Sequence, residues 1–428
     1  MTKTTLTVSD SVMQEVRDMA YDAQLSARVL AKADTRWKNK ALETMAADLQ
    51  SHSEMIVQQN REDLAREKEA GMSDAMLDRL ALSSQRVDDL AQSLRDLQGL
   101  ADPVGQVMRG STLPNGLRMV QTRVPLGVIG AIYEARPNVT VDIAGLAIKS
   151  GNAVMLRGGS AALKSNQIIC RVLRAALDRT GLPMDCIQSV DEFGREGANA
   201  LMLATGDLDV LIPRGGRQLI QSVVQNAKVP VIETGEGNCH IFIDHSAPEK
   251  MAREIVLNAK TQRPGTCNTV ETLLLAEGAP VAKSVLEALI KAGVTLHLDE
   301  RSQQLVAAGE HTKRATEEDW GTEYGSLDLA VATVDSLDAA IAHIHRYSTG
   351  HSEAIVTENF AHAETFIEQV ESAAVYVNAS TRFTDGAQFG LGAEVGISTQ
   401  KLHARGPMGL EHLTTSKWIV RGDGQIRT

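Results

Sequence analysis

The chain has 428 residues, of which 43% are hydrophobic and 23% charged, which predicts a folded protein of two or three domains and excludes a disordered one. Lys and Arg number 43 against 54 for Asp and Glu, a net charge of −11 with no basic block, so we expect no binding to nucleic acid. The N-terminal residues lack the order of a secretion signal, and no apolar run is long enough to span a bilayer. We therefore expect a cytoplasmic protein that has no contact with a membrane.

Apolar residues recur at intervals of three and four between about Val8 and Leu100, which predicts a helical N-terminal region. From Pro103 to Val124, two β-prone arms flank a Pro-Asn-Gly turn and predict a protruding hairpin. The last apolar run, Leu413–Arg421, is typical of a terminal strand that pairs with another element or another subunit.

Between the hairpin and this terminal strand, short apolar runs alternate with amphipathic helical stretches. This alternation favours right-handed β-α-β units and mostly parallel, doubly wound sheets. The first block contains the runs LGVIGAIYE, NAVMLR, CIQSV, DVLIP and VPVIE, and the second contains HIFID, VETLLLAE, VTLHLD, LDLAVATV, EAIVTE and AAVYVN. The predicted fold class is therefore α/β, with two such layers.

Two glycine pairs follow predicted strands and are candidate phosphate sites. Arg157-Gly158-Gly159-Ser160 offers a close backbone approach and a fixed positive charge for a phosphorylated ribose. Arg214-Gly215-Gly216-Arg217 lies where a strand meets a helix, whose N–H groups and dipole favour an anion. A plain β-α turn explains each pair equally well, and neither matches the GxGxxG fingerprint.

A lone thiol, Cys267, lies in the run TQRPGTCNTVETLLL, directly after a Pro-Gly turn and before an apolar stretch. A turn of this kind can offer backbone N–H groups to a thiolate and to an oxyanion, so a nucleophilic cysteine is one reading and a small core residue is the other. The other cysteines, at 170, 186 and 239, show no CxxC spacing, so we expect neither a disulfide framework nor a zinc site.

Two further side chains could take part in catalysis. Asn138 follows Pro137 and could donate to an oxyanion or simply form a turn. Glu233 ends an apolar run and could be a general base or a loop carboxylate. His343, His345 and His351 fit no common zinc pattern, so we expect helix-surface and turn residues and no metal.

In chain order, the segments VPLGVIGAIYEARPN, KSGNAVMLRGGS, VIETGEGN, PGTCNTVE, TEYG and AAVYVN resemble the aldehyde dehydrogenase superfamily over nearly the whole chain. The stretches from Ser336 to Ile355 and from Phe389 to Leu410 are similar to the branch that reduces γ-glutamyl phosphate in proline biosynthesis. The resemblance implies a cofactor domain at 1–103 and 123–235 with part of 376–403, a catalytic domain at 236–375, and an oligomerisation element at 104–122 and 404–428.

The resemblance also implies roles for single residues. Cys267 matches the nucleophile, and Asn138 matches the side-chain half of the oxyanion hole. Glu233 matches the base of members that oxidise aldehydes, a role that a reductase does not need. The implied cofactor-binding positions are Arg157 and Ser160 near the adenosine ribose, Gly215 and Gly216 at the pyrophosphate, and Glu323 at the nicotinamide ribose. Ser160 stands where NAD-preferring members often carry a glutamate, which favours NADPH.

The activity implied is NADPH-dependent reduction of L-glutamyl 5-phosphate to L-glutamate 5-semialdehyde, through a cysteine thioester and with release of phosphate. Arg136, Arg263 and Arg382 are candidate cations for the phosphate and carboxylate of this substrate. The alternatives are an NADP-dependent aldehyde dehydrogenase that hydrolyses its thioester and a catalytically silent, oligomeric binding protein. The implied partners are further copies of the chain and glutamate 5-kinase.

Overall fold

The computed structural model describes residues 6–427, which form two compact units. Unit 1 contains the chain up to Thr234, the short segment Gly390–Gly396 and the segment from Met408 onward. Unit 2 contains Gly235–Phe389 and Ile397–Pro407. The C-terminal part of the chain therefore contributes to both units.

A four-stranded parallel sheet in the order β5-β4-β3-β6 lies at the core of unit 1. All residues of the central strand β3 are buried, as is usual in a parallel sheet whose crossover helices cover both faces. The runs predicted at its positions are confirmed as strands. They are β3 (Val128–Tyr133), β4 (Ala153–Arg157), β5 (Ile187–Ser189) and β6 (Val210–Arg214).

The helices of unit 1 include the predicted N-terminal helical region. Helix α2 begins after Asp34, whose side chain accepts a hydrogen bond of 2.8 Å from the backbone N–H of Trp37. Helices α6 and α7 end at Gly151 and Gly181, where φ is 82° and 83° and glycine adopts the left-handed conformation without strain. The helices are α1 (Asp10–Leu30), α2 (Thr35–Ser51), α3 (Ser53–Glu69), α4 (Asp74–Leu80), α5 (Ser84–Gly99), α6 (Pro137–Ser150), α7 (Leu163–Thr180), α8 (Gly194–Leu203) and α9 (Arg217–Asn226).

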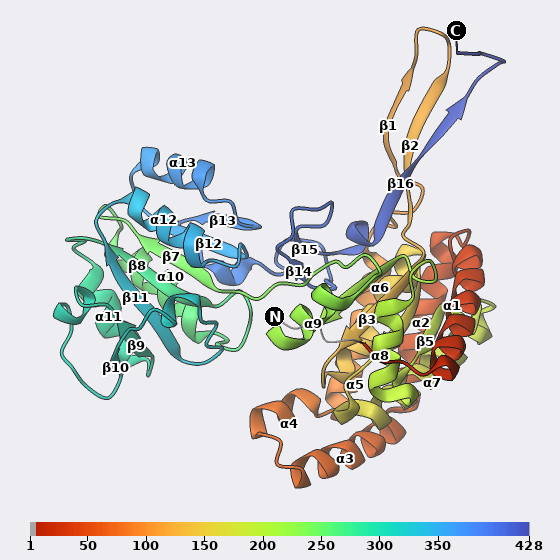
Figure 1. The fold of residues 1–428 in the computed structure, drawn as a ribbon, viewed down its shortest axis with the longest axis horizontal. Helices are drawn as coiled ribbons and strands as arrows, with labels where there is room; N and C mark the ends of the chain where they lie inside the picture. Colours follow the sequence, from red (N-terminus) through yellow and green to blue (C-terminus); the bar gives the residue numbers. More distant parts are fainter. Residues whose placement is uncertain (1–5, 428) are drawn as a thin grey trace. The chain divides into compact units, whose positions relative to one another are not determined.

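A three-stranded antiparallel sheet extends from unit 1 as an arm (Figure 1). Its strands are β1 (Val107–Thr112), β2 (Arg118–Pro125) and β16 (Thr414–Arg421), with β2 in the centre. The predicted hairpin and the predicted terminal strand are thus parts of one sheet. All residues of β1 are exposed, so the arm has little core of its own.

A seven-stranded parallel sheet in the order β10-β9-β11-β8-β7-β12-β13 organises unit 2. Its central strands β7, β8, β11 and β12 are almost wholly buried. The strands are β7 (Cys239–Ile243), β8 (Val270–Ala276), β9 (Thr295–Leu298), β10 (Thr312–Arg314), β11 (Asp328–Val334), β12 (Ser352–Val356) and β13 (Ala374–Val377), and the helices are α10 (Glu249–Thr261), α11 (Ala282–Lys291), α12 (Leu337–Tyr347) and α13 (Phe360–Gln369). A small pair, β14 (Ile397–Ser398) and β15 (Gly406–Pro407), completes the unit.

The strand predicted at VPVIE is wrong. Val231 forms only an isolated bridge with Leu211, because Pro230 has no N–H to donate to a continuous ladder. The short edge strand β10, in contrast, was not predicted. Its three residues, Thr312–Arg314, are all polar and only Thr312 is β-branched, so no apolar pattern indicates a strand.

Within residues 6–427, no helix has both the length and the apolar character needed to cross a bilayer.

Candidate active site

Cys267 lies in a turn between α10 and β8, at the amino end of that strand. The following residue fixes the turn: the Asn268 side chain donates to the carbonyl oxygens of Arg382 (3.3 Å) and Thr384 (2.9 Å). The carbonyl oxygen of Asn268 in turn accepts from the Thr381 hydroxyl at 2.7 Å. The backbone directly after the candidate nucleophile is therefore held by three hydrogen bonds.

The segment before β7 packs directly against this turn. A Cβ atom added to Gly237 would lie 1.3 Å from the carbonyl oxygen of Cys267 and 2.8 Å from its Cα, so only glycine fits there. The thiol of Cys239, two residues later, donates to the same carbonyl at 3.2 Å. Sequence reasoning missed both contacts, although the Gly-rich string TGEGN was a signal for close backbone approach.

The surroundings of the thiols distinguish Cys267 from the other cysteines. Cys267 is half-buried, whereas Cys170, Cys186 and Cys239 are buried. Burial raises the pKa of the Cys186 thiol to about 12 and raises the pKa values of Cys170 and Cys239 well above their ordinary range. Buried thiols of this kind stay protonated and inert, so Cys267 is the cysteine suited to nucleophilic chemistry.

The structure brings Arg382 and Arg263 to the Cys267 turn. Arg382 donates to the Thr266 hydroxyl at 2.8 Å and to the Gln262 side chain at 3.0 Å. The Arg263 carbonyl oxygen accepts from the Thr266 and Thr269 hydroxyls, each at 2.9 Å. Burial lowers the pKa of Arg382 while the charge of a Cys267 thiolate raises it, so a cation lies close to the candidate nucleophile.

Glu323 lies in an exposed segment that is attached to a buried ion pair. The Gly325 N–H donates to Glu271 at 3.3 Å, and the other oxygen of Glu271 accepts from Lys260 at 2.6 Å. Both charged side chains are fully buried, and Lys260 also donates to the Val270 carbonyl. Burial raises the pKa of Glu271 to about 7 although Lys260 acts in the opposite direction. Sequence reasoning missed this pair, because the apolar run around Glu271 gave no sign of it.

The remaining predicted residues belong to unit 1. Asn138 is in the first turn of α6 (Pro137–Ser150), after the exposed Arg136, and its side-chain amide donates to Asp142 at 3.1 Å. Sequence reasoning missed Asp142, although its spacing of four residues on a predicted helix was a usable signal. Glu233 is half-buried at the end of the irregular segment after α9, and burial raises its pKa.

Arg157 ends β4, and its Nε donates to the Gly194 carbonyl at 3.2 Å. Burial lowers the pKa of Arg157, and the nearby Asp191 carboxylate acts against this. Asp191 accepts a hydrogen bond from the Gly158 N–H at 2.6 Å. The same carboxylate therefore fixes the turn after β4 and lies near Arg157. Burial raises the pKa of Asp191 to about 6.

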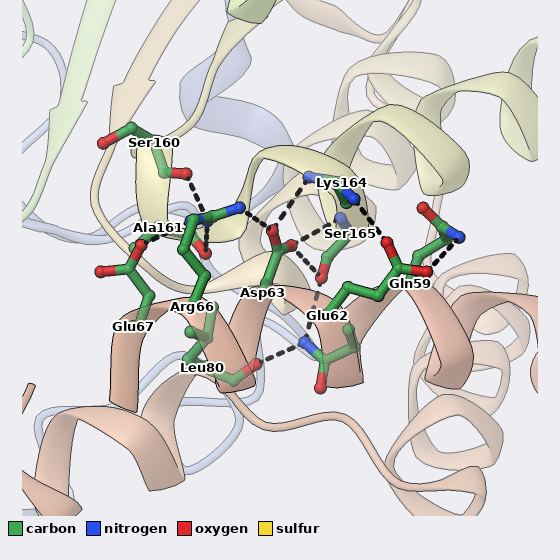
Figure 2. A network of polar contacts seen from close by, with 11 residues as sticks. Gln59, Glu62, Asp63, Arg66, Glu67, Leu80, Ser160, Ala161, Lys164 and Ser165 are labelled. Atoms are coloured by element: carbon green, nitrogen blue, oxygen red, sulfur yellow. Dashed lines mark hydrogen bonds and ion pairs between the residues drawn. The ribbon is translucent and has the colours of Figure 1, made fainter. Parts of the chain in front are cut away.

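Helix α3 holds the loop that carries Ser160 (Figure 2). Arg66 donates to the carbonyl oxygens of Ser160 and Ala161, each at 2.9 Å. Asp63 accepts from the backbone N–H and the hydroxyl of Ser165, each at 2.8 Å, and so caps α7. The exposed Ser160 therefore lies on a loop whose backbone is fixed.

Gly215 and Gly216 form an exposed turn directly before α9 (Arg217–Asn226). The Gly216 N–H donates to the Glu134 carboxylate at 2.9 Å, so this turn binds a carboxylate oxygen through a backbone donor. The N–H group that was predicted to bind phosphate is thus occupied by a carboxylate of the chain itself.

The expectation for the histidines is partly wrong. His345 is exposed on α12, but His351 is fully buried and contacts the Ser352 hydroxyl at 2.8 Å. His343 packs edge-on against His240 and Trp320. Burial lowers the pKa values of His343 and His351 to about 3 and about 4, so both are neutral, but only His351 is fully buried and His343 is half-buried.

Comparisons with known proteins bear on this arrangement. The sequence profile of the aldehyde dehydrogenase family matches residues 2–319 and 329–419. A protein of Moorella thermoacetica called gamma-glutamyl phosphate reductase is 55% identical over 421 residues, which cover 97% of this chain and 100% of that protein. The crystal structure of gamma-glutamyl phosphate reductase from Thermotoga maritima is 46% identical, with a TM-score of 0.93 over 97% of this chain and 100% of that one. A probable aldehyde dehydrogenase from Listeria monocytogenes, at 16% identity and a TM-score of 0.73 over 97% of this chain and 98% of that one, shares the fold.

The chain therefore belongs to the aldehyde dehydrogenase family. Within that family, its similarity to proteins called gamma-glutamyl phosphate reductase extends over nearly its full length. The resemblance to the superfamily and to this branch, and the α/β fold with parallel sheets, are confirmed.

Proposed function

We propose that the chain reduces L-glutamyl 5-phosphate to L-glutamate 5-semialdehyde with NADPH as the reductant, in proline biosynthesis. The observation that supports this most directly is the full-length identity, above 50%, to a protein called gamma-glutamyl phosphate reductase. The local geometry agrees with it, because the half-exposed Cys267 lies on a fixed turn beside the cation of Arg382.

In the proposed reaction, the Cys267 thiolate attacks the acyl carbon of the substrate. A tetrahedral oxyanion forms, the carbon–oxygen bond to phosphate breaks, and inorganic phosphate leaves a glutamyl thioester on the sulfur. Asn138 and the Cys267 backbone N–H are the proposed donors to the oxyanion. Arg382, Arg263 and Arg136 are the proposed cations for the phosphate and carboxylate groups, since guanidinium binds such anions in a bidentate manner.

The residues of unit 1 fit a phosphorylated dinucleotide. The turn at Gly216 binds an anionic oxygen at a helix N-terminus, here that of Glu134. Arg157 supplies a cation at the end of β4, and the residue at the ribose position is the uncharged Ser160. Arg157 and Ser160 would hold the 2′-phosphate of the adenosine ribose, and Gly215 and Gly216 the pyrophosphate. Glu323, a residue of unit 2, is the proposed partner of the nicotinamide ribose. When bound, NADPH supplies the hydride that reduces the thioester to the aldehyde.

The test is phosphate-dependent formation of NADPH from glutamate semialdehyde and NADP. We expect this activity in the wild-type chain and its loss in Cys267→Ala, which should still bind NADPH because the sulfur belongs to the reaction and not to the cofactor site. Acid formation that does not depend on phosphate would instead show that the thioester is hydrolysed, with Glu233 as the base. A variant Cys267→Ala with undiminished turnover would exclude the proposed mechanism.

We also propose that the arm mediates homo-oligomerisation. Its outer strands β1 and β16 expose large apolar side chains: Val107 is 64% exposed, Met108 50%, Trp418 45% and Val420 51%. Apolar side chains on edge strands favour association with another chain. A single mass on light scattering that equals the monomer would contradict this.

Association with glutamate 5-kinase is a further part of the proposal. It rests on the chemistry of the substrate, because an acyl phosphate hydrolyses and cyclises in water. Co-purification of the two enzymes and retention of the intermediate in a coupled assay would support it, and free diffusion of the intermediate without co-purification would contradict it.

A further inference from the structure

Asp142 is an acidic side chain to which the proposed reaction gives no role. It lies on α6 four residues after Asn138, so the two side chains share one face of the helix. The Nδ2 atom of Asn138 donates to Oδ2 of Asp142 at 3.1 Å. Both residues are half-buried. The carboxylate therefore contacts the very amide that is proposed to stabilise the oxyanion.

The two ends of a side-chain amide have opposite hydrogen-bonding character. Its nitrogen carries two N–H donors and its oxygen only accepts, yet the two ends have nearly the same shape and can exchange by a flip. An ionised carboxylate can only accept, so Asp142 favours the orientation in which the nitrogen of Asn138 faces it. One N–H is then bound to Asp142, and the second remains for another acceptor.

We infer that Asp142 is a positioning residue, which holds Asn138 with its N–H group and not its oxygen available to the oxyanion formed on the substrate. This inference rests on the proposed role of Asn138. In the flipped orientation, the amide oxygen would face the oxyanion and repel it. A hydrogen-bond donor that is held in place is more effective than one that must reorient during the reaction, because it already points at the oxygen when negative charge develops there.

The effect of Asp142 on the orientation of Asn138 should depend on pH, because it requires the ionised carboxylate. Burial raises the pKa of Asp142 to about 6, while the hydrogen bond from Asn138 and the charge of Arg214 on β6 act in the opposite direction. A protonated Asp142 can donate to the amide oxygen and no longer selects one orientation. Acylation of Cys267 should therefore slow as the pH falls through about 6.

The test is a double-mutant cycle on acylation of Cys267. The variants are Asp142→Asn, Asn138→Ala and the double variant, and the probe is 4-nitrophenyl acetate, an activated ester that acylates a thiol through the same kind of oxyanion. We expect the rate of acylation to fall about hundredfold in Asn138→Ala, which removes one donor to the oxyanion. It should fall about tenfold in Asp142→Asn, which leaves that donor misoriented. The double variant should be no slower than Asn138→Ala, because Asp142 acts through that amide.

Three further readouts separate positioning from a merely structural role. Asp142→Asn should lose the part of the decrease in rate near pH 6 that protonation of Asp142 causes, and should keep the part caused by protonation of the Cys267 thiolate. It should also keep the wild-type affinity for NADPH and should unfold within a few degrees of the wild type. Asp142→Glu, which keeps a carboxylate, should recover part of the rate. The matched control is Asp18→Asn, because Asp18 accepts from Gln14 at 2.9 Å with the same spacing on the exposed face of α1. This control should retain the wild-type rate.

An equal loss on Asp142→Asn in the wild-type and Asn138→Ala backgrounds would overturn the inference, as would an unchanged rate in either single variant. The substrate assignment is tested separately by phosphate-dependent NADPH formation. If that reaction is absent but the ester cycle shows coupling, the proposed substrate fails and the role of Asp142 stands. If the reaction is present and the cycle is additive, the proposed function stands and the inference fails.

Discussion

The two units place their charged side chains differently. In unit 1, strands β3, β4 and β6 are apolar inside the sheet, and the charges of Glu134, Arg157 and Arg214 lie at the carboxyl ends of the strands. In unit 2, ionisable side chains lie within the sheet: His240 on β7, Glu271 on β8 and Glu353 on β12 are all fully buried.

The two arrangements differ in what a substitution of a charged side chain should change. Charges at strand ends remain partly in water, so a substitution there changes ligand binding with little cost to folding. Charges buried in a sheet must be paired, so a substitution there leaves a desolvated partner and costs stability. We therefore expect activity and stability to change together in unit 2, and binding to change alone in unit 1.

The largest effect is expected from Lys260→Met, which leaves the buried Glu271 without its cation. The free energy of unfolding should fall by about 3–5 kcal/mol, because the remaining carboxylate is desolvated and unpaired. Urea unfolding of the purified chain measures this. The control is Lys250→Met on the same helix, where the side chain is 81% exposed and its ion pair with Glu254 is long, at 4.0 Å. Equal losses in the two variants would remove the distinction between the units.

Gly237→Ala should have the next largest effect, because the new Cβ would displace the carbonyl of Cys267. We expect a loss of stability of about 1–3 kcal/mol and a decrease in kcat of about tenfold or more, since the proposed nucleophile, Cys267, moves with its backbone. Calorimetry and steady-state kinetics report the two effects. Gly309→Ala serves as the control, because a Cβ there meets nothing within 4 Å. A stable and fully active Gly237→Ala would show that the turn is not constrained in the way described.

Arg157→Glu tests the expectation for unit 1, where a substitution at a strand end should change ligand binding and leave stability nearly unchanged. Reversal of this charge should weaken NADPH binding by about 10- to 100-fold, or about 1.4–2.7 kcal/mol. It should change NADH binding much less, because only NADPH carries a 2′-phosphate on its adenosine ribose. Titration of both nucleotides followed by fluorescence gives the ratio. The exposed Arg171 on α7 provides the control substitution, Arg171→Glu. An unchanged ratio would contradict the assignment of the ribose site.

The smallest effect is expected at Asp244, a charge at the end of β7. Burial raises its pKa, but hydrogen bonds from Ser246, Thr357 and His362 outweigh burial and lower the pKa to about 2, below the usual 3.8. The ionised form therefore stabilises the fold above about pH 4, and this contribution is lost as the pH falls towards 2. Asp244→Asn should cost about 1–2 kcal/mol at pH 7.

Thermal unfolding as a function of pH checks this last prediction. The difference in Tm between the wild type and Asp244→Asn should narrow as the pH is lowered from about 4 towards 2, because Asp244 of the wild type becomes protonated over this range. A difference that stays constant over this range would mean that the charge of Asp244 does not contribute.

Much of the fold could be predicted from local pattern. Buried parallel strands leave apolar runs, which is why runs such as VIGAI and LLLA lie in β3 and β8. The same pattern gave a wrong prediction at VPVIE, where a single proline interrupts the hydrogen-bond ladder. It did not predict the polar edge strand Thr312–Arg314.

The candidate site was predictable only in part, because its supporting contacts join residues that are distant in sequence. Cys267 and its Pro-Gly turn carry a local signal. The contact of Gly237 with that turn, the Lys260–Glu271 pair and the Glu134 carboxylate at Gly216 arise from packing, and no spacing in the sequence encodes them. The Asn138–Asp142 contact is different, because both residues lie on one helix and a spacing of four residues predicts their meeting.

The arm joins two parts of the chain that are made at very different times during translation. Strand β2 pairs with β16 over its whole length, from Pro125 opposite Thr414 to Arg118 opposite Arg421. Since β2 is the central strand, one edge of the hairpin stays unpaired until β16 has been synthesised. A chain that is terminated before β16 thus keeps this edge of β2 unpaired, which favours aggregation or binding by chaperones.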